Sequence, residues 1–458
     1  MRPSLAAARE LATRQLDHDG LRPVVVAHDT WLAAGLQRAL PGTALACIAA
    51  SDAVEVLRQR GTDVFCLSEA IGPDATAGMS SLDLLRHPAT AAFFADLGPT
   101  AVLAFKPSER IQAAVEALGG RLLAAPSSAA RAYENKLAFI AAAERAGVPR
   151  PLWRAMRLPA DLAALTAGLG PRVVVQGARG NAGQRTWVVD DQPGLDAVVA
   201  REGGAVVRVA EYIEGMPFTS SGVAFSAPGT GLARPRLAAL VEPCRQVTGV
   251  PWLTPEELGS CGNVWGGPDL QAMRREAARC VRALAADLSA ANYHGVFGVD
   301  FVHASDGPLV IEVNPRMVAS LPVATELEVE AGRAPLLLLH LLEMLDAHIH
   351  EIEDDEAPDL PLGTATQVIL HRLPGDAGTR PRGGVYRVGA AREVEFVRPG
   401  AGLEDLEDDG ELLVLTRRAG EPVTDRKEFA RVYSRSSAGE NTPGLEALVA
   451  YIRDGAAA

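Results

Sequence analysis

At 458 residues the chain is long enough for roughly two to four lobes and a sizeable buried core. Its formal net charge of −13 argues against binding to nucleic acid or to an anionic membrane, because both need a basic surface. The five cysteines show neither CxxC nor His/Cys metal spacing, which indicates a reduced, cytoplasmic compartment without structural zinc. We expect no membrane span, because the apolar run 334–345 is short and contains His340 and Glu343, and no signal peptide.

The first part of the chain alternates short apolar segments with helical ones. Strands are predicted at 23–27, 44–48, 64–67, 101–105 and 121–124, and helices at 31–39 and 109–118. This alternation is typical of an α/β domain with a parallel sheet. No GxGxxG follows the first strand, so we do not predict a dinucleotide site.

The middle of the chain mixes helices with strands of a different kind. A helix is predicted at 130–146, ended by Gly147 and Pro149, and strands at 172–175, 186–189, 206–209 and 237–242. A glycine-rich loop is expected at 259–268, followed by a long amphipathic helix at 269–290 and a helix at 335–345. Beyond a linker at 358–361, strands at 366–371, 394–397 and 412–416 predict a small β-rich lobe. The acidic runs 351–356 and 404–409 are expected to be solvated loops.

The segments 298–302 and 311–316 carry the strongest chemical signal. Both are apolar and extended, and the turn-forming residues 305–308 between them predict an antiparallel strand pair. Glu312, Asn314 and Arg316 alternate with Val313 and Pro315, so a strand would put all three on one face, near Asp300. Two carboxylates and an amide oxygen suit Mg²⁺, and a cation stands beside them. The alternative is a hairpin whose polar face is merely solvated.

Four features in this order resemble the ATP-grasp superfamily of carboxylate–amine ligases, which includes biotin carboxylase and the bacterial L-amino-acid ligases. They are Asn135-Lys136 early in a helix, the glycine-rich segment 177–183, the segment 211–213, and the strand pair. The resemblance covers residues 21–345 and, more faintly, the C-terminal lobe. It implies an ATP-grasp fold, α/β and α+β. The implied parts are an N-terminal Rossmann-like domain at 1–129, an ATP-grasp domain at 130–350 with a small flexible lobe at about 165–215, and a β-rich domain at 351–458.

The resemblance also implies how the nucleotide is held. Lys136 would reach the phosphates, and the loop with Gly180 and Gly183 would fold over them, since glycine lets backbone N–H groups approach phosphate oxygens. The family usually has a second lysine where this chain has Gln176, and our hypothesis is that Arg179 or Arg185 supplies the missing cation. The competing interpretations are an exposed helix lysine, a plain glycine hairpin and surface arginines.

Further roles follow from the same resemblance. Glu211, Tyr212 and Ile213 match the hinge that holds adenine, although Glu211 could instead be an exposed residue at a strand end. Asp300, Glu312 and Asn314 match the ligands of a pair of Mg²⁺ ions, for which Mn²⁺ can substitute. Arg316 matches the arginine that contacts the carboxylate or its acyl phosphate, a role that suits a guanidinium fork. The competing role for Arg316 is a structural ion pair.

The substrate-binding residues are harder to predict. Candidates for an acceptor pocket are Arg245, Ser260, Cys261, Gly262 and Ser320. The segment 260–267 is expected at the start of a helix, where N–H groups favour anions, but it could equally be a plain helix-entry turn. Cys261 is not expected to be a nucleophile, because no histidine with a suitable partner stands near it in sequence.

The resulting hypothesis is an ATP- and Mg²⁺-dependent ligase. It would activate a carboxylate as an acyl phosphate and join it to an amine, using amino acids or a small specialised metabolite. One alternative is an ATP-grasp carboxylase or a ligase of the purine-biosynthesis type. Another is a non-catalytic ATP-binding regulator, which only Gln176 supports. The expected partners are small molecules, with neither nucleic acid nor membrane, and the resemblance is compatible with a homodimer.

Overall fold

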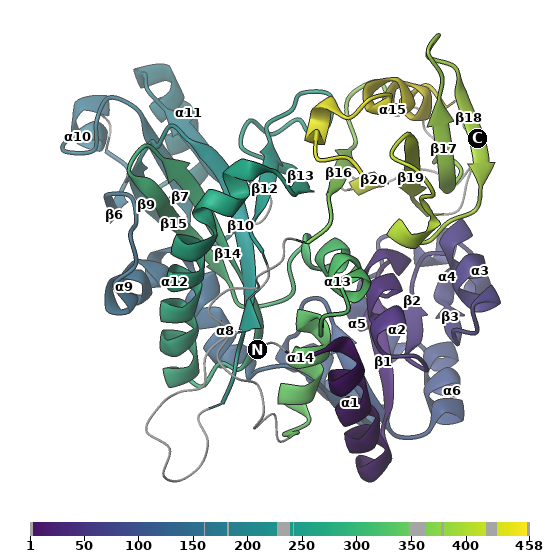
Figure 1. Ribbon diagram of the computed structural model, residues 1–458. Helices are drawn as coiled ribbons and strands as arrows, with labels where there is room; N and C mark the ends of the chain where they lie inside the picture. Colours follow the sequence, from purple (N-terminus) through teal and green to yellow (C-terminus); the bar gives the residue numbers. More distant parts are fainter. Residues whose placement is uncertain are drawn as a thin grey trace.

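The computed structural model describes residues 3–159, 161–180, 183–226, 242–347, 362–376, 380–417 and 428–455, together with the backbone of 239–240. Three sheets with helices packed on them make up these residues (Figure 1). The N-terminal part lies at the right of this view, below the C-terminal lobe. Among the described helices, none combines the length and apolarity that a membrane crossing requires.

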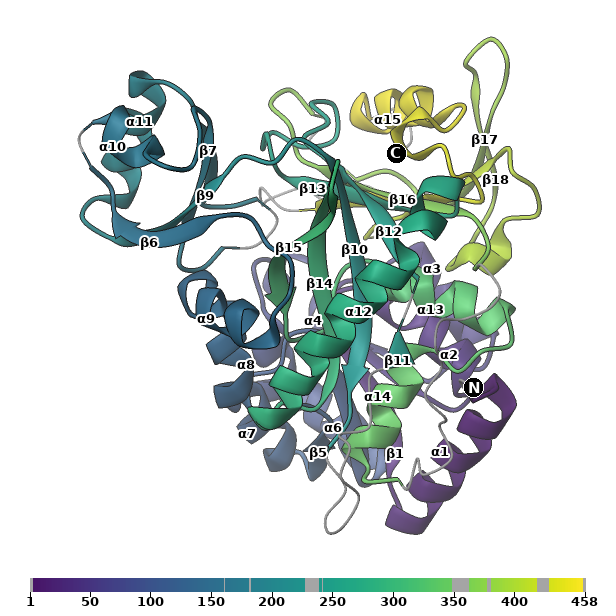
Figure 2. The same ribbon diagram turned by 60° about the vertical axis from the view of Figure 1, so that its left-hand side comes forward.

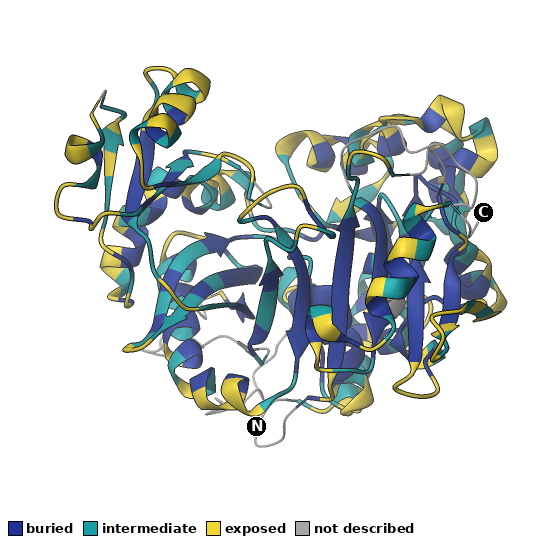
Figure 3. Ribbon diagram, turned by 90° about the horizontal axis from the view of Figure 1, so that it is seen from above, coloured by how far each residue is buried: buried dark blue, intermediate teal, exposed yellow. Residues whose placement is uncertain are grey.

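The N-terminal sheet is parallel, with strand order β3-β2-β1-β4-β5. The residues of β1 and β4 are buried almost throughout, as expected for parallel strands that helices cover on both faces. Figure 3 shows dark-blue strands between helices whose outward surfaces are yellow. The strands are β1 (Arg22–Ala27), β2 (Ala44–Cys47), β3 (Val64–Cys66), β4 (Thr100–Ala104) and β5 (Gly120–Leu122). The helices are α1 (Leu5–Asp19), η1 (Thr30–Leu32), α2 (Ala34–Ala39), α3 (Asp52–Gln59), α4 (Leu67–Ile71), η2 (Asp74–Thr76), α5 (Ser81–Arg86), α6 (Pro88–Leu97) and α7 (Glu109–Ala117).

The helix predicted at 130–146 is in fact two helices, α8 (Ser127–Glu134) and α9 (Lys136–Ala146). They are separated by Asn135, whose backbone is extended and whose side-chain oxygen accepts hydrogen bonds from the N–H groups of Leu137 and Ala138. Asparagine is a strong N-cap, so it ends one helix and starts the next. This break places Lys136 at the first position of α9.

A four-stranded antiparallel sheet, order β6-β9-β7-β8, forms a small lobe that stands apart at the upper left of Figure 2. Val173 and Val175 of β7 pack into the core of this lobe, so the residues that alternate with them face the other side. Gln176 is one of these, and it lies directly opposite Arg208 of β9. The elements are β6 (Trp153–Arg157), α10 (Leu162–Thr166), β7 (Val173–Gly177), β8 (Thr186–Val189), α11 (Gln192–Glu202) and β9 (Val206–Glu211).

The third sheet is long and continuous, with order β15-β14-β10-β12-β13-β16-β20-β19-β17-β18 and with β11 beside β10. Its strands are β10 (Met216–Ala224), β11 (Ala239–Leu240), β12 (Cys244–Thr248), β13 (Ser260–Trp265), β14 (Gly295–Ala304), β15 (Gly307–Asn314), β16 (Ala365–His371), β17 (Gly384–Val388), β18 (Val394–Arg398), β19 (Glu411–Leu415) and β20 (Glu428–Ser434). The helices are α12 (Pro268–Ala290), α13 (Leu321–Glu330), α14 (Leu336–Met344), η3 (Leu403–Asp405), η4 (Gly439–Asn441) and α15 (Leu445–Arg453). Because β13 pairs with β16, the sheet crosses the domain boundary expected at residue 350. The three-domain division itself stays a prediction.

The predicted α/β and α+β class is confirmed by the parallel N-terminal sheet, the antiparallel sheets and the helices packed on them. The loop expected at 259–268 is wrong, because residues 260–265 form strand β13. Gly262 serves close strand packing there, since a Cβ at this position would overlap the carbonyl oxygen of Gln367 on β16. Parts of other predicted segments, namely 181–182, 237–238, 241, 351–356 and 358–361, lie outside the described residues.

Glu326 of α13 predicts how stability depends on pH. Its side chain is 1% exposed, its Oε2 accepts a hydrogen bond from the N–H of Leu403 at 2.6 Å, and burial raises its pKa to about 8. Between about pH 4.5 and pH 8 the folded protein keeps a proton that the unfolded chain has released. The contribution of this group to the free energy of unfolding therefore falls as the pH rises through that window.

We expect Glu326→Gln to gain stability relative to the unaltered protein as the pH rises from 5.5 to 8.5, by on the order of 1–3 kcal/mol. Urea unfolding at the two pH values measures this difference. The exposed Glu395 of β18 offers a matched control, and Glu395→Gln should change little. A stability difference for Glu326→Gln that is the same at both pH values would contradict the assignment.

Candidate active site

Strands β14 and β15 form the predicted hairpin, with Ser305 and Asp306 as its two-residue turn. Asp300 lies directly opposite Glu312, and the Nδ2 of Asn314 donates to the Oδ2 of Asp300 at 3.0 Å. The intervening side chains, including Val299 and Val313, pack into the core beneath α12. The alternation of the strands thus brings the three polar residues together, as the sequence predicted.

Two carboxylates facing each other across a strand pair repel, and the surroundings offset this repulsion. The buried ammonium of Lys136 forms an ion pair with Oε2 of Glu312, and the Nε2 of Gln246 on β12 donates to the Oδ1 of Asp300 at 3.0 Å. Burial, and next the charge of Glu312, raise the pKa of Asp300 above its usual value. The charges of Lys136 and Arg316 act in the opposite direction.

Arg316 lies two residues beyond the end of β15 and is held in place from several sides. Its Nη2 donates to the Oδ1 of Asn314 at 3.0 Å, its Nη1 donates to the carbonyl of Met317 at 3.0 Å, and its Nε lies 3.3 Å from the Oε1 of Glu134. The side chain is 14% exposed. The guanidinium is therefore a fixed cation next to the carboxylate pair.

The donor set of the hairpin fits a hard divalent cation. Asp300, Glu312 and Asn314 offer oxygen atoms, which Mg²⁺ and Mn²⁺ prefer, and Mg²⁺ commonly takes one or two carboxylates and completes its shell with phosphates and water. No group of three or more His, Cys, Asp or Glu side chains suited to a metal occurs among the described residues. The site therefore suits a metal that arrives with phosphate oxygens better than a fully protein-enclosed ion.

On the small lobe, Gln176 is bound to a residue that sequence reasoning missed. The Oε1 of Gln176 accepts from the Nε of Arg208 at 3.0 Å and also from its Nη2. Arg208 is 2% exposed, and its guanidinium carbon lies 4.8 Å from the ring centroid of Trp153. Burial lowers the pKa of Arg208 to about 10, so the side chain remains a cation at neutral pH. The sequence feature that could have revealed Arg208 is a single charged residue within the otherwise apolar strand 206–210.

The glycine-rich segment after β7 touches the metal side of the site through its backbone. The N–H of Lys136 donates to the carbonyl of Ala178 at 3.0 Å. Gly183 has φ +81° and passes so close to Gly259 that a side chain would not fit. Arg185 forms a two-point ion pair with Glu202 of α11. The roles predicted for Arg179, Gly180, Gly183 and Arg185 in phosphate binding remain predictions.

The hinge segment follows β9 and leads into β10. The Oε1 of Glu211 accepts a hydrogen bond from the N–H of Leu152 at 2.7 Å, so this carboxylate ties the hinge to the start of β6. The guanidinium of Arg172 stacks 3.9 Å from the ring centroid of Tyr212. Ile213 follows in the same connection. Binding of adenine by these residues remains a prediction.

The candidate substrate residues lie on the neighbouring strands β12 and β13 and just before α13. Arg245 of β12 pairs with Glu440 at 2.8 Å. Ser260, Cys261 and Gly262 belong to β13 rather than to a helix start. Burial raises the pKa of the fully buried Cys261 thiol to about 11, which agrees with the expectation that it is no nucleophile. The buried Ser320 lies just before α13, close in sequence to Arg316.

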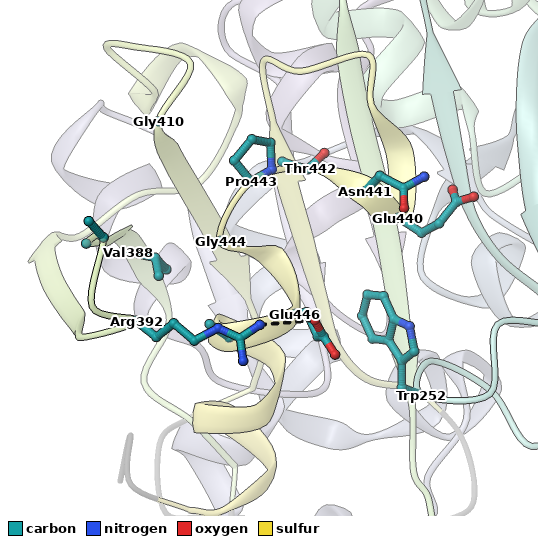
Figure 4. Close-up of a pocket in the computed structure, with 13 residues that line it drawn as sticks. Trp252, Val388, Arg392, Gly410, Glu440, Asn441, Thr442, Pro443, Gly444 and Glu446 are labelled. Carbon is teal, nitrogen blue, oxygen red and sulfur yellow. Dashed lines mark hydrogen bonds and ion pairs between the residues drawn. The ribbon is translucent and has the colours of Figure 1, made fainter.

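A pocket of about 670 Å³ lies in the C-terminal lobe (Figure 4). Trp252 and Glu440 line one side, while Arg392 and Glu446 form an ion pair across the other side at 3.3 Å. The hairpin carboxylates do not line it. This pocket is thus separate from the group formed by Lys136, Asp300, Glu312 and Arg316, here called the charged cluster, and we place the candidate chemistry at that cluster.

The ATP-grasp domain family matches residues 133–320, a span that begins just before Lys136 and ends just after Arg316. The chain contains an ATP-grasp domain. Curated protein sequences gave no match to it.

Solved structures share this ATP-grasp fold over most of the chain. The biotin carboxylase domain of a 2-oxoglutarate carboxylase from Hydrogenobacter thermophilus has a TM-score of 0.58 at 14% identity, over 90% of this chain and 86% of that one. Biotin carboxylase from Campylobacter jejuni gives 0.59 at 14% identity, over 90% and 86%. N5-carboxyaminoimidazole synthase from Aspergillus clavatus gives 0.54 at 13% identity, over 94% and 99%. At these identities the likeness shows the fold alone.

The N-cap that positions Lys136 can be tested directly. Replacing Asn135 with alanine removes the acceptor for the first N–H groups of α9, and we expect a loss of about 1 kcal/mol in the free energy of unfolding. Urea denaturation measures the loss. Asn135→Ser keeps a capping oxygen and should retain most of the stability. Equal losses in the two variants would show that capping is not the role of this side chain.

Proposed function

We propose that the protein is an ATP-dependent ligase that activates a carboxylate as an acyl phosphate and joins it to an amine. The observation that supports this most is the position of Arg316, a fixed cation hydrogen-bonded to Asn314 beside the carboxylates of Asp300 and Glu312. A site that only bound nucleotide would have little use for a guanidinium at that point. An acid substrate needs such a group, because a guanidinium fork matches a planar carboxylate.

Each side chain then has a definite task. Arg316 orients the acid so that one carboxylate oxygen faces the γ-phosphate of ATP. Lys136 supplies a positive charge for the phosphates from the start of α9. Mg²⁺ held by Asp300, Glu312 and Asn314 would draw negative charge from the phosphate oxygens. Phosphoryl transfer depends mainly on such positioning and electrostatic stabilisation.

The proposed reaction has two steps, formation of an acyl phosphate and then formation of an amide. A carboxylate oxygen forms a bond to the γ-phosphorus as the bond to the ADP oxygen breaks, which gives an acyl phosphate and ADP. The amine nitrogen then attacks the acyl carbon, the carbon–oxygen bond to phosphate breaks, and the nitrogen loses a proton to solvent. The products are an amide, ADP and phosphate. Exclusion of water during the first step falls to the glycine-rich segment near Gly183.

We propose an amino acid or another small organic acid as the acid substrate, as the resemblance to the ATP-grasp ligases implies. The five free cysteines support a cytoplasmic location.

A carboxylation reaction is the second candidate, because of what similar structures contain. The Hydrogenobacter thermophilus structure is a dimer with MgADP, ADP and bicarbonate, and the Aspergillus clavatus structure contains ADP and 5-aminoimidazole ribonucleotide. In this alternative, bicarbonate takes the place of the organic acid at Arg316. A homodimer is proposed on the same basis.

An ADP-release assay with a library of amino acids and small carboxylates, with and without bicarbonate, separates the candidates. We expect ADP release that requires an acid and an amine together with Mg²⁺, and mass spectrometry should then find an amide. Release that depends on bicarbonate would point to the carboxylase. Nucleotide binding without ADP release under any combination would point to a regulator.

The hairpin carboxylate gives the sharpest single test. Glu312→Gln removes one charge from the metal site, and we expect turnover to fall by roughly 100-fold or more while the circular dichroism spectrum is unchanged. The exposed Asp306 in the turn of the same hairpin provides the matched control, and Asp306→Asn should keep full turnover. Undiminished turnover in Glu312→Gln would refute the assignment.

A further inference from the structure

We propose that Arg208, held by Gln176, is the residue through which the small lobe binds a phosphate group of the nucleotide. The inference rests on the ATP-dependent function proposed above. It names the group that does the work of the lysine missing at position 176. The ligand is a phosphate oxygen, and the site consists of side chains from two neighbouring strands, β7 and β9.

The first reason is that Arg208 is a buried cation with incomplete compensation. It is 2% exposed, and within the described part of the chain its Nη1 has no hydrogen-bond partner. An uncompensated buried charge is costly, and an unpaired buried donor adds to that cost. An incoming phosphate oxygen would satisfy both the charge and the free N–H groups.

The second reason is the direction in which the residue faces. Arg208 and Gln176 lie opposite each other, so both side chains are on the face that points away from the lobe's own core. Trp153 is on this face too, and it contacts Phe139 of α9 with ring centroids 5.9 Å apart. Lys136 is the first residue of the same helix, and the charge of Glu312 acts on Arg208. The guanidinium therefore belongs to the charged cluster.

The third reason is the way in which Gln176 binds the guanidinium. Its amide oxygen accepts from Nε and Nη2, which fixes the plane of the group and leaves Nη1 available. A lysine at 176 would instead repel the arginine opposite it. Glutamine and arginine thus form a matched pair in which the positive charge comes from β9 instead of β7. A planar guanidinium is well suited to phosphate oxygens.

Arg185 differs from Arg208 in how its positive charge is balanced. Both ends of its guanidinium are engaged by the carboxylate of Glu202, so its charge is already compensated. Its side chain is also 47% exposed. The matched control is Arg201→Ala, because Arg201 is an exposed arginine in the last turn of α11 in the same lobe and has no predicted part in nucleotide binding.

The test compares the binding of adenosine with that of ADP in the presence of Mg²⁺, by calorimetry, in the full-length protein. Arg208→Met should weaken ADP binding by about 10- to 100-fold, as expected for a charged hydrogen bond, and leave adenosine binding unchanged. Methionine fills similar space without charge, so the melting temperature should not fall. Arg208→Lys keeps the charge but loses the fork, and it should lose part of the ADP affinity. Arg201→Ala should behave like the unaltered protein.

A double variant adds a positive test. Gln176→Lys combined with Arg208→Met moves the cation to β7, and it should recover much of the ADP affinity that Arg208→Met loses. A purely structural role for Arg208 does not predict this rescue.

Two results would overturn the inference. One is an unchanged ratio of ADP to adenosine affinity in Arg208→Met, whether both affinities stay the same or both fall equally. The other is no recovery of ADP affinity in the double variant. If Arg208→Met fails to fold, Arg208→Lys decides in the same way through the affinity ratio. If the unaltered protein binds neither ADP nor ATP, the proposed function fails as well, which distinguishes that outcome from the others.

Discussion

Two carboxylates that face each other across one strand pair set the constraint on which the rest of the site depends. Asp300 and Glu312 are kept together by the register of β14 and β15, and their repulsion must be offset by their neighbours. The start of α9 brings the ammonium of Lys136 to Glu312, while amide groups from β12 and β15 donate to Asp300. The break at Asn135 is therefore part of the site, because it fixes where Lys136 begins its helix.

Cations reach this cluster from separate parts of the chain, and each is fixed in its own way. Lys136 is placed by a helix start, Arg316 by the end of a strand, and Arg208 by a glutamine on the neighbouring strand. Fixed cations around a pair of carboxylates suit a reaction between two anions, since they lower the repulsion between an acid and a phosphate before any bond forms. This shared property, more than any one residue, links the geometry to ATP-dependent activation of an acid.

The sequence was sufficient for features that depend on local alternation or turn chemistry. The hairpin around Asp300 and Glu312 is an example, because the residues that define its face are two apart and its turn is short. Features that depend on distant neighbours were missed. Gly262 looked like a loop residue, and only the strand around Gln367 explains why it is glycine. Arg208 finds its partner 32 positions away, so its meaning appears only when β7 and β9 are paired. The break at Asn135 was within reach, since asparagine before a helix is a common cap.

The continuous sheet from β15 to β18 has a mechanical consequence. Backbone hydrogen bonds link the β14–β15 hairpin through β13 and β16 to the C-terminal lobe, so these parts are coupled mechanically as one sheet. In the part of the chain that the structure describes, the four strands of the small lobe form no strand pair with that sheet. The small lobe is connected to it by the chain before β6 and by the hinge after β9. Gln176 and Arg208 belong to the small lobe, while Asp300 and Glu312 belong to the continuous sheet. A change in the angle between these two parts would therefore alter the distance between the arginine and the carboxylates.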